Sequence, residues 1–560
     1  MMASKQNLAQ RALAQVVIWL GGTLLWLAVY LGIDHVFAAL EPSYQVKPEG
    51  LTIAIVGLWF ALTLALRSVV AAWMAALFFA AAQWGQFLHY SYYGAPIAPH
   101  EPVLLFTEWR EITVAFSGLL HHFWAALLLP LLPLAVFAAV RRMNRRFGVQ
   151  GRWWPGMLFL ALWLVLPLKA YRHPENTQAF YPRPYGYALK NAWLVTSYAI
   201  GATAAHGGIS ALAAAQSVSG EPYHVRPIGE GVDGVIVLVM GESTNPSVMS
   251  AFGNPQPTTP FLASLRTCPT CIVTIGQSAG VATKVTLPMF FNLQREPWRS
   301  DIPVTGKSNL ISLAKQHGYR VVVESAQTNN LFTFTRADSA DHFCTVDRCD
   351  PNRAEAGVDR VLLERIAAEP FRDKTLLILH TRVAHSAYDR YLPPGWQPFP
   401  VDTSSRSAQM QTTYRNAVAW FDELARQIVT AVRSKTDKPI WFILTGDHNE
   451  LLGEGGRWGH GQLTAHAGEV PVVVAAWNGA TIPEPWPSRL RCRPTHYELG
   501  QFVAELLGWE VYSPEESPRV LYTNGPDLGG KAGWIELTRR IAEDGRCDVV
   551  ERLVPPGRHP

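Results

Sequence analysis

The sequence has few charged residues and almost no net charge, and both features narrow the possible functions. Lys and Arg number 48 against 44 for Asp and Glu, so the formal net charge is +4 over 560 residues, of which 16% are charged. Proteins that bind nucleic acid through its phosphates need a clear basic surplus. We therefore expect no nucleic-acid partner. The length is sufficient for more than one domain.

Cysteine is absent from the first 267 residues of the chain. The six cysteines are Cys268, Cys271, Cys344, Cys349, Cys492 and Cys547. An even number, arranged as two close pairs and one distant pair, favours disulfides and an oxidising compartment. Free thiols or metal ligands are the alternatives, and the C-x-x-C at 268–271 alone is compatible with redox or zinc chemistry. A zinc ribbon needs a second such pair at suitable spacing, which the sequence lacks.

Polar residues are scarce in the first 170 positions, where we find five long apolar runs. They cover roughly 13–33, 51–66, 69–88, 119–140 and 153–170. Runs of about 17–25 apolar residues predict transmembrane helices, although the second run is short. The first run is too long for a signal peptide, and no small-residue cleavage site follows it. We predict an α-helical transmembrane domain of five spans over residues 1–172.

Basic residues near the ends of these runs predict the orientation. Lys5 and Arg11 precede the first run, Arg67 separates the second from the third, and five arginines lie in 141–152. With five spans all three segments fall on one side, which the positive-inside rule assigns to the cytoplasm. The N-terminus is then cytoplasmic, and the chain after about 172 is outside. We interpret 173–230 as interfacial helices and a linker, because its apolar stretch also contains polar residues.

The segment 231–560 has the pattern of an α/β sandwich. A continuous β-branched run at 235–240 lies between two glycines, as in a strand buried on both faces of a parallel sheet. Similar runs occur at 319–323, 376–379, 440–444 and 470–475, separated by segments with helical spacing at 309–316, 358–368 and 414–433. This alternation predicts strands and helices in turn.

Residues able to bind a metal follow several of these runs. Glu242 comes after the first, Asp447 and His448 after the run at 440–444, and His380 and His385 after the run at 376–379. Ligands of such sheets bind beyond the carboxyl ends of the strands, and carboxylate and imidazole are ligands that zinc prefers. Taken singly, an Asp-His pair can be a capped turn and Glu242 a helix-capping partner. Their shared position at strand ends indicates a zinc site.

These motifs resemble those of the phosphoethanolamine transferases, which belong to the alkaline phosphatase/sulfatase superfamily and include lipid A modifying and colistin-resistance enzymes. The similar segments are 239–244 with 249–253 and 258–260, the nucleophile turn at 278–288, and a second metal motif at 447–461. Five spans followed by a periplasmic domain is also the family's architecture. The resemblance thus extends over nearly the whole chain.

The resemblance implies a bacterial inner-membrane enzyme with a periplasmic, Zn²⁺-dependent catalytic domain over 231–560. Such an enzyme transfers phosphoethanolamine from phosphatidylethanolamine to lipopolysaccharide or another envelope glycan, through a covalent phosphoethanolamine-threonine intermediate, and releases diacylglycerol. The implied zinc ligands are Glu242, Thr283, Asp447 and His448. Thr283 is the implied nucleophile, since a bound metal lowers the pKa of a hydroxyl. A threonine in this place could also cap a helix.

Four further residues match family positions. His385 and His460 are implied to bind the substrate phosphate, protonate the leaving group or hold a second zinc ion. Thr107 and Glu111, four residues apart, match residues implicated in holding the lipid donor. An ordinary amphipathic helix is the alternative for the segment that contains them.

The sequence departs from the family pattern at the nucleophile turn. Ala279-Gly280-Val281 stands where the family often has Cys-Gly-Thr, so a disulfide beside the nucleophile is absent. Cys344 with Cys349 resembles a family disulfide. We pair Cys268 with Cys271 because they are close in sequence. Cys492 and Cys547 are then the two cysteines that remain, and we pair them with each other.

Three other functions stay open. A glycerol-phosphate transferase of the lipoteichoic acid synthase type shares the five-span layout, but the paired cysteines disfavour it. A phosphodiesterase or sulfatase would use water as acceptor, and the turn at 278–288 lacks the Cys/Ser-x-Pro-x-Arg pattern of sulfatases. An inactive scaffold is disfavoured because the metal-binding residues are intact. The sequence leaves the acceptor undetermined.

Overall fold

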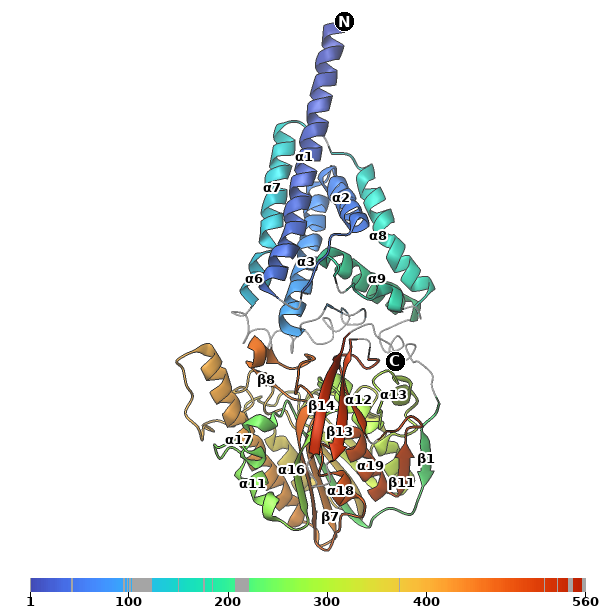
Figure 1. Ribbon diagram of the computed structural model, residues 1–560, viewed down its shortest axis with the longest axis vertical. Coiled ribbons are helices and arrows are strands. Elements are labelled where there is room, and N and C mark those ends of the chain that lie inside the picture. Colours follow the sequence, from blue (N-terminus) through green and yellow to red (C-terminus); the bar gives the residue numbers. More distant parts are fainter. Residues whose placement is uncertain are drawn as a thin grey trace. The chain divides into compact units, whose positions relative to one another are not determined.

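The computed structural model describes residues 2–41, 44–93, 96, 97, 99, 102, 123–149, 151–174, 177–183, 185–206, 221–371, 373–517, 519–530, 532–541 and 547–555. The chain divides into two compact units, Met1–Gln216 and Ser217–Pro560 (Figure 1). The first is built from helices, and the second contains all the strands of the described part. We describe each unit by itself.

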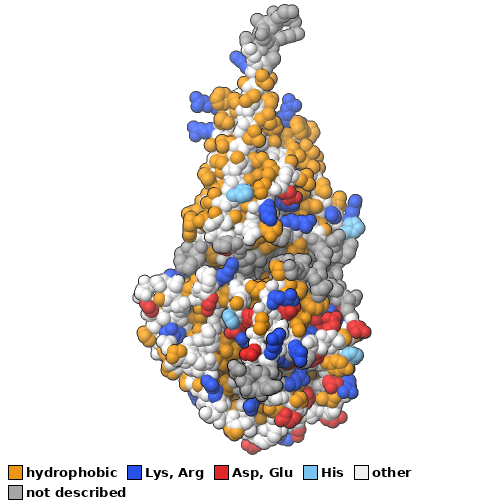
Figure 2. Space-filling view, viewed as in Figure 1, with side chains coloured by type: hydrophobic (Ala, Val, Ile, Leu, Met, Phe, Trp, Pro, Cys, Tyr) orange, Lys and Arg blue, Asp and Glu red, His pale blue; other side chains and the backbone are white. Residues whose placement is uncertain are grey.

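The helices of the first unit follow the apolar runs of the sequence. They are α1 (Met2–Leu40), α2 (Gly50–Leu64), α3 (Val69–Tyr93), α6 (Trp124–Leu128), α7 (Leu131–Arg146), α8 (Trp154–Arg172) and α9 (Ala188–His206). Large apolar side chains are exposed on them, such as Leu13, Val70 and Met157, and Figure 2 shows hydrophobic side chains over much of this unit. Such a surface suits lipid rather than water.

Four of the five predicted spans have the length and hydropathy to cross a membrane. They are Gln10–Leu40, Val69–Tyr92, Trp124–Arg146 and Trp154–Arg172. The remaining one, α2, is apolar but has 15 residues, which corresponds to about 22 Å of helix against a hydrocarbon core of about 30 Å. By length and composition, four helices are thus candidate spans, and the predicted count of five rests on α2.

The basic segments of the first unit lie at one end of its helices. Arg67 N–H donates to the carbonyl of Arg152 (3.0 Å), so the α2–α3 and α7–α8 links run side by side. Arg141 donates to the carbonyls of Leu64 (2.8 Å) and Leu66 (2.6 Å) at the same links. This clustering is what the predicted topology requires, while the assignment of that end to the cytoplasm stays a prediction.

Helix α9 packs closely on α8 through Gly201. A Cβ at this position would lie 2.2 Å from the carbonyl oxygen of Pro167 and 2.7 Å from Cβ of Ala170. Only glycine therefore permits this approach. The helix is the longest element in the described part of 173–230, and its place at the membrane surface stays a prediction.

The second unit is built on a seven-stranded sheet with the order β3-β10-β7-β2-β6-β4-β5. The strands are β2 (Gly234–Gly241), β3 (Cys271–Gln277), β4 (Arg320–Ser325), β5 (His342–Cys344), β6 (Lys374–His380), β7 (Ile440–Gly446) and β10 (Glu469–Trp477). All five predicted strands are confirmed. Strand β10 is antiparallel to β7 and β3, whereas β2 is parallel to both of its neighbours.

Helices cover both faces of this sheet. They are α11 (Pro260–Ser264), α12 (Thr283–Phe291), α13 (Asp301–Thr305), α14 (Leu310–Gln316), α15 (Val346–Cys349), α16 (Arg360–Ala368), α17 (Arg406–Arg433), α18 (Trp486–Arg489) and α19 (His496–Leu506). Figure 1 shows α16 and α17 on one side of the sheet and α12 and α19 on the other. Ile236 and Leu238 of β2 form one core with Phe290 of α12 and Phe502 of α19. The predicted α/β sandwich is confirmed.

A second sheet forms near the C-terminus from β12 (Val520–Asn524), β13 (Trp534–Ile541) and β14 (Cys547–Val554). Leu521, Ile535 and Leu537 of this sheet pack on Val281 of the turn before α12. Short strands pair as β1 (His224–Pro227) with β11 (Trp509–Tyr512) and as β8 (Leu451–Leu452) with β9 (Trp458–Gly459). None of these strands was predicted from the sequence.

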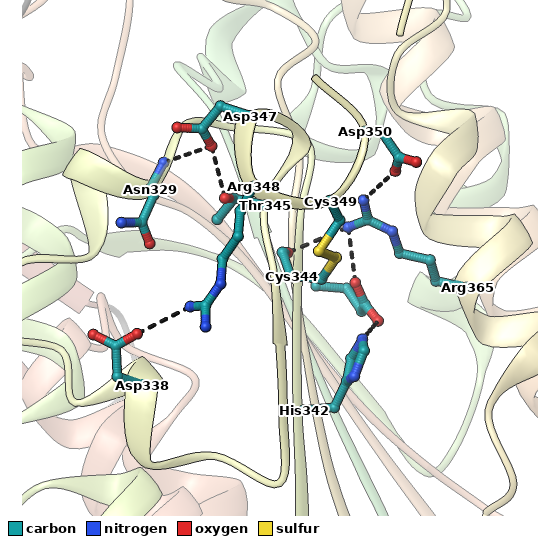
Figure 3. The surroundings of a disulfide bond; sticks show 11 residues. Asn329, Asp338, His342, Cys344, Thr345, Asp347, Arg348, Cys349, Asp350 and Arg365 are labelled. Carbon is teal, nitrogen blue, oxygen red and sulfur yellow. Dashed lines mark hydrogen bonds and ion pairs between the residues drawn. A yellow bond between two sulfur atoms is a disulfide. The ribbon is translucent and has the colours of Figure 1, made fainter. Parts of the chain in front are cut away.

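The three predicted disulfides are confirmed, and none of the cysteines is free. Figure 3 shows the Cys344–Cys349 bond beside Arg365, which donates to the carbonyl of Cys344 (3.2 Å) and to Asp350 (2.5 Å). The bond Cys492–Cys547 joins strand β14 to the segment before α19. Three disulfides in one domain agree with an oxidising compartment.

Candidate metal and catalytic site

Neighbouring strands bring the predicted metal-binding residues together. Strands β2 and β7 are parallel, with Gly241 in register with Gly446. Glu242 follows the first strand, and Asp447 with His448 follows the second. Thr283 enters from the first turn of α12, where Ala282 is the N-cap. The carboxyl ends of the strands thus define the site, as expected for a sheet of this kind.

The Thr283 hydroxyl lies among three possible ligands. It donates a hydrogen bond to Asp447 Oδ2 (2.6 Å) and lies 3.1 Å from His448 Nε2 and 3.3 Å from Glu242 Oε2. His448 Nε2 is also 3.5 Å from Glu242 Oε1. All four side chains are buried. The structure therefore brings the four predicted zinc ligands to one point.

Burial determines the charge of this cluster. It raises the pKa of the Asp447 carboxyl and lowers the pKa of His448 well below its usual value. Burial likewise lowers the pKa of His380 to about 4. The imidazoles are thus neutral at physiological pH and keep a lone pair for a metal. Buried carboxylates beside neutral imidazoles are a donor set typical of zinc.

His380 is a possible ligand that follows strand β6 and was predicted to lie near the metal without a specific role. Its side chain is 1% exposed, and Nε2 lies 3.9 Å from Glu242 Oε2. Neither ring nitrogen has a hydrogen-bond partner in the described part of the chain. Glu242, His380 and Asp447 each offer a ligand atom within 4.8 Å of the others. A buried imidazole without such partners fits a site that binds a metal.

Hydrogen bonds orient the ligands from behind. Gln327 Nε2 donates to Glu242 Oε2 (2.6 Å), and the backbone N–H of Ser243 donates to Asp447 Oδ1 (2.9 Å). His448 Nδ1 lies 3.0 Å from the carbonyl oxygen of Asn449. Since a carbonyl only accepts, Nδ1 carries the proton and Nε2 faces the site with its lone pair.

The two further histidines lie beside this cluster. The rings of His448 and His460 are 4.3 Å apart, and those of His460 and His385 are 5.6 Å apart. His460 Nδ1 lies 3.1 Å from Glu450 Oε2, and His385 Nδ1 donates to the carbonyl of Ser386 (2.6 Å). Burial lowers the pKa of His385 well below its usual value. Glu242, His448 and His460 form a second group that could hold a metal.

Two predicted site residues lie outside the described part of the chain, and two candidate site residues were not predicted. Thr107 and Glu111, predicted to hold the lipid donor, lie outside the described residues. Gln327 and Glu450 were not predicted as site residues. Gln327 comes two residues after β4, so the rule of strand ends could have indicated it. Glu450 belongs to the segment that follows β7, where only the first two residues were assigned a role.

Comparison with known proteins shows which families the chain is similar to. Residues 235–508, which lie in the second unit, match the sulfatase family model. The integral membrane protein lipooligosaccharide phosphoethanolamine transferase A (EptA) from Neisseria meningitidis has a similar fold. The TM-score is 0.54 at 16% identity, over 87% of this chain and 95% of that one.

Two curated relatives are phosphoethanolamine transferases. The chain is 28% identical over 231 residues to the Kdo(2)-lipid A phosphoethanolamine 7''-transferase of Escherichia coli K12, which is 40% of each chain. It is 25% identical over 309 residues to the phosphoethanolamine transferase EptA of Helicobacter pylori, which is 52% of this chain and 56% of that one. The matches thus span about half the length of these relatives or less. The predicted resemblance is confirmed.

Proposed function

We propose that this protein transfers phosphoethanolamine from phosphatidylethanolamine to a lipid-linked glycan, and that Thr283 is the nucleophile. The convergence of the Thr283 hydroxyl with Glu242, Asp447 and His448 in a buried site carries the proposal. The relatives' names support the transferred group, and two of them name Kdo(2)-lipid A and lipooligosaccharide, which supports lipopolysaccharide as the acceptor class.

In the first half-reaction, the Thr283 oxygen attacks phosphorus and forms a phosphoethanolamine-threonine. The bond from phosphorus to the diacylglycerol oxygen breaks, and the hydroxyl proton leaves through Asp447 Oδ2, its acceptor at 2.6 Å. Zinc, held by Glu242, Thr283, Asp447 and His448, would supply positive charge that lowers the pKa of a hydroxyl and offsets charge on the phosphoryl oxygens. A proton delivered by His460 completes diacylglycerol, and His460 takes a proton back in the second half-reaction.

In the second half-reaction, an oxygen of the acceptor attacks the same phosphorus, and the Thr283 oxygen leaves and regains its proton. His460 takes the proton of the acceptor as general base. Glu450 supports this role, because its carboxylate lies at His460 Nδ1 and stabilises the protonated ring. His385, next to His460, is a second candidate for binding the phosphate. Thr107 and Glu111 remain our proposed binding residues for the lipid donor.

We further propose a bacterial inner-membrane protein whose catalytic domain is periplasmic. The basic end of the helical unit then faces the cytoplasm together with the N-terminus. Three disulfides in the second unit support an oxidising periplasm. Within this topology residues 1–172 form the membrane domain, 173–230 an interfacial linker and 231–560 the catalytic domain.

Mass spectrometry of the purified full chain after incubation with zinc and phosphatidylethanolamine tests the proposal. We expect a phosphoethanolamine adduct on the peptide that contains Thr283, and no adduct after zinc chelation. Two variants form a matched pair: Thr283→Val keeps the shape and removes the hydroxyl, whereas Thr283→Ser keeps a hydroxyl. The adduct should vanish in the first and persist at a reduced rate in the second.

Two outcomes would contradict the proposal. A normal adduct in Thr283→Val would exclude Thr283 as nucleophile. An adduct that forms with phosphatidylglycerol and not with phosphatidylethanolamine would favour the glycerol-phosphate transferase instead.

A further inference from the structure

His496 connects the two sides of the candidate site without belonging to its ligand cluster. It is the first residue of α19 and is fully buried. The backbone N–H of Ala279 donates to its Nδ1 (3.1 Å), and its Nε2 lies 3.0 Å from Thr445 Oγ1. The ring therefore spans from the turn before α12 to the end of β7.

The hydrogen bonds determine the protonation of this ring. A backbone N–H only donates, so Nδ1 must carry the lone pair, and the neutral ring carries its proton on Nε2. Burial lowers the pKa of His496 to about 3, so the ring stays neutral at physiological pH. Nε2–H then donates to Thr445 Oγ1. One imidazole thus makes two directed hydrogen bonds to different elements.

These two elements carry opposite parts of the site. Ala279 stands four residues before Thr283, and Thr445 stands two residues before Asp447. The contact between them, from the Thr283 hydroxyl to Asp447, is 2.6 Å long. A shift of either element by about 1 Å would break this contact, and a misplacement of that size can reduce a rate about 100-fold.

The turn has no covalent anchor. Ala279 offers no thiol, and the six cysteines form the three disulfides already described. Besides His496, Asn524 of β12 holds the turn, because its N–H donates to the carbonyl of Ala279 (2.7 Å) and its carbonyl accepts from Val281 N–H (3.1 Å). Hydrogen bonds therefore hold the backbone that presents Thr283.

His496 is itself firmly anchored. Thr495 and Glu498 form a capping box at the start of α19. Arg539 Nη2 donates to Glu498 Oε1 (2.6 Å), and Arg539 Nη1 donates to Glu498 Oε2 (3.1 Å) and to the carbonyl of Cys492 (3.0 Å). Arg539 and Glu498 are both buried. A bidentate pair of this kind has a defined geometry, so α19 presents the imidazole in a fixed position.

We propose that His496 is a positioning residue, which holds the Thr283 turn and the Asp447–His448 segment at the separation that the site needs. This role rests on the proposed function of Thr283. It predicts an effect on adduct formation and on zinc affinity, since removal of a partner behind the ligands typically costs 10–100-fold in either. A purely packing role, through the ring of Phe290 at 5.2 Å, predicts a loss of stability alone.

The test compares variants of the full chain in detergent. His496→Ala removes both hydrogen bonds. His496→Asn keeps an acceptor at the position of Nδ1 for Ala279, and Thr445→Val removes the other partner. The matched control is His317→Ala, because His317 hydrogen-bonds the Leu507 carbonyl at the opposite end of α19 (2.7 Å). For each variant we would measure thermal unfolding, zinc affinity by competition with a chelator, and the rate of adduct formation from phosphatidylethanolamine.

We expect His496→Ala to lower the adduct rate and the zinc affinity about 10–100-fold, His496→Asn to restore part of this loss, and His317→Ala to lower only the unfolding temperature. A folded His496→Ala variant whose adduct rate and zinc affinity are both within about threefold of wild type would overturn the proposal. A partial loss that is as large in His496→Asn as in His496→Ala would overturn it as well. A wild-type protein that binds zinc without forming an adduct would refute the proposed function, and zinc affinity would still decide the role of His496.

Discussion

Gln327 offers a sharp test of whether Glu242 is a metal ligand. Its side chain is 2% exposed, and Nε2 donates to Glu242 Oε2 (2.6 Å) and to the carbonyl of Thr381 (3.1 Å). Gln327→Leu has nearly the same size and removes the donor. A hydrogen bond to a charged group contributes about 1.5–3 kcal/mol, and loss of a residue behind a ligand weakens metal binding about 10–100-fold. The two magnitudes agree, since tenfold is about 1.4 kcal/mol.

Zinc affinity, measured by competition with a chelator of known strength, is the assay. Gln501→Leu is the matched control, because Gln501 is also buried and donates to the carbonyl of Val511 (2.8 Å) away from the site. We expect Gln327→Leu to weaken zinc binding at least tenfold and Gln501→Leu to leave it unchanged. Zinc affinity within twofold of wild type in a folded Gln327→Leu protein would refute the reasoning that Glu242 binds the metal.

Three further predictions concern stability, each measured by denaturant unfolding of the full chain. Replacement of Cys492 and Cys547 by Ala opens a loop of separation 55 and should cost about 4 kcal/mol; an unchanged midpoint would contradict this. Arg539→Met leaves Glu498 buried without its partner and should cost about 3–5 kcal/mol, part of which a second change, Glu498→Gln, should restore. Burial raises the pKa of Asp359 from 3.8 to about 6. The contribution of the neutral carboxyl to stability is therefore complete below pH 3.8, and it is lost as the pH rises through 6 and the carboxyl ionises. The free energy of unfolding of Asp359→Asn, relative to that of wild type, should rise by about 3 kcal/mol between pH 4 and 7. A difference between the two proteins that does not change with pH would be evidence against the raised pKa.

The sequence was a reliable guide to the buried strands and a poor one to the edges of the sheets. The run 235–240 is buried along its whole length in β2, which is why composition alone identified it. Strand β3 lies at the edge of the sheet with an irregular burial pattern, and β14 is largely exposed. Neither has a continuous apolar run. The direction of β10 was not predictable either, because a strand buried on both faces has the same apolar sequence pattern whether its neighbours are parallel or antiparallel.

The residues of the candidate site also fall into those that the sequence predicted and those that it did not. Glu242 and Asp447 stand within three residues of the predicted runs 235–240 and 440–444 and directly after β2 and β7, so strand direction alone indicated that they meet. Gln327 and His496 contact partners 85 and 217 residues away in sequence, and no local pattern marks such contacts. Thr283 came from resemblance to a family motif, since a threonine at the start of a helix is otherwise an ordinary cap. Residues that bind directly were thus easier to predict than residues that orient them.

The burial of Glu242 and Asp447 explains why this site needs such support. Two carboxylates removed from water in one place destabilise the fold by several kcal/mol unless opposite charge or donors compensate. His380 and His448 cannot supply that charge, because burial keeps their pKa low. Backbone and side-chain N–H groups compensate part of it, and a divalent cation would compensate the rest. The features that make these carboxylates unfavourable without metal therefore favour its binding, and they keep the Thr283 hydroxyl among acceptors that can take its proton.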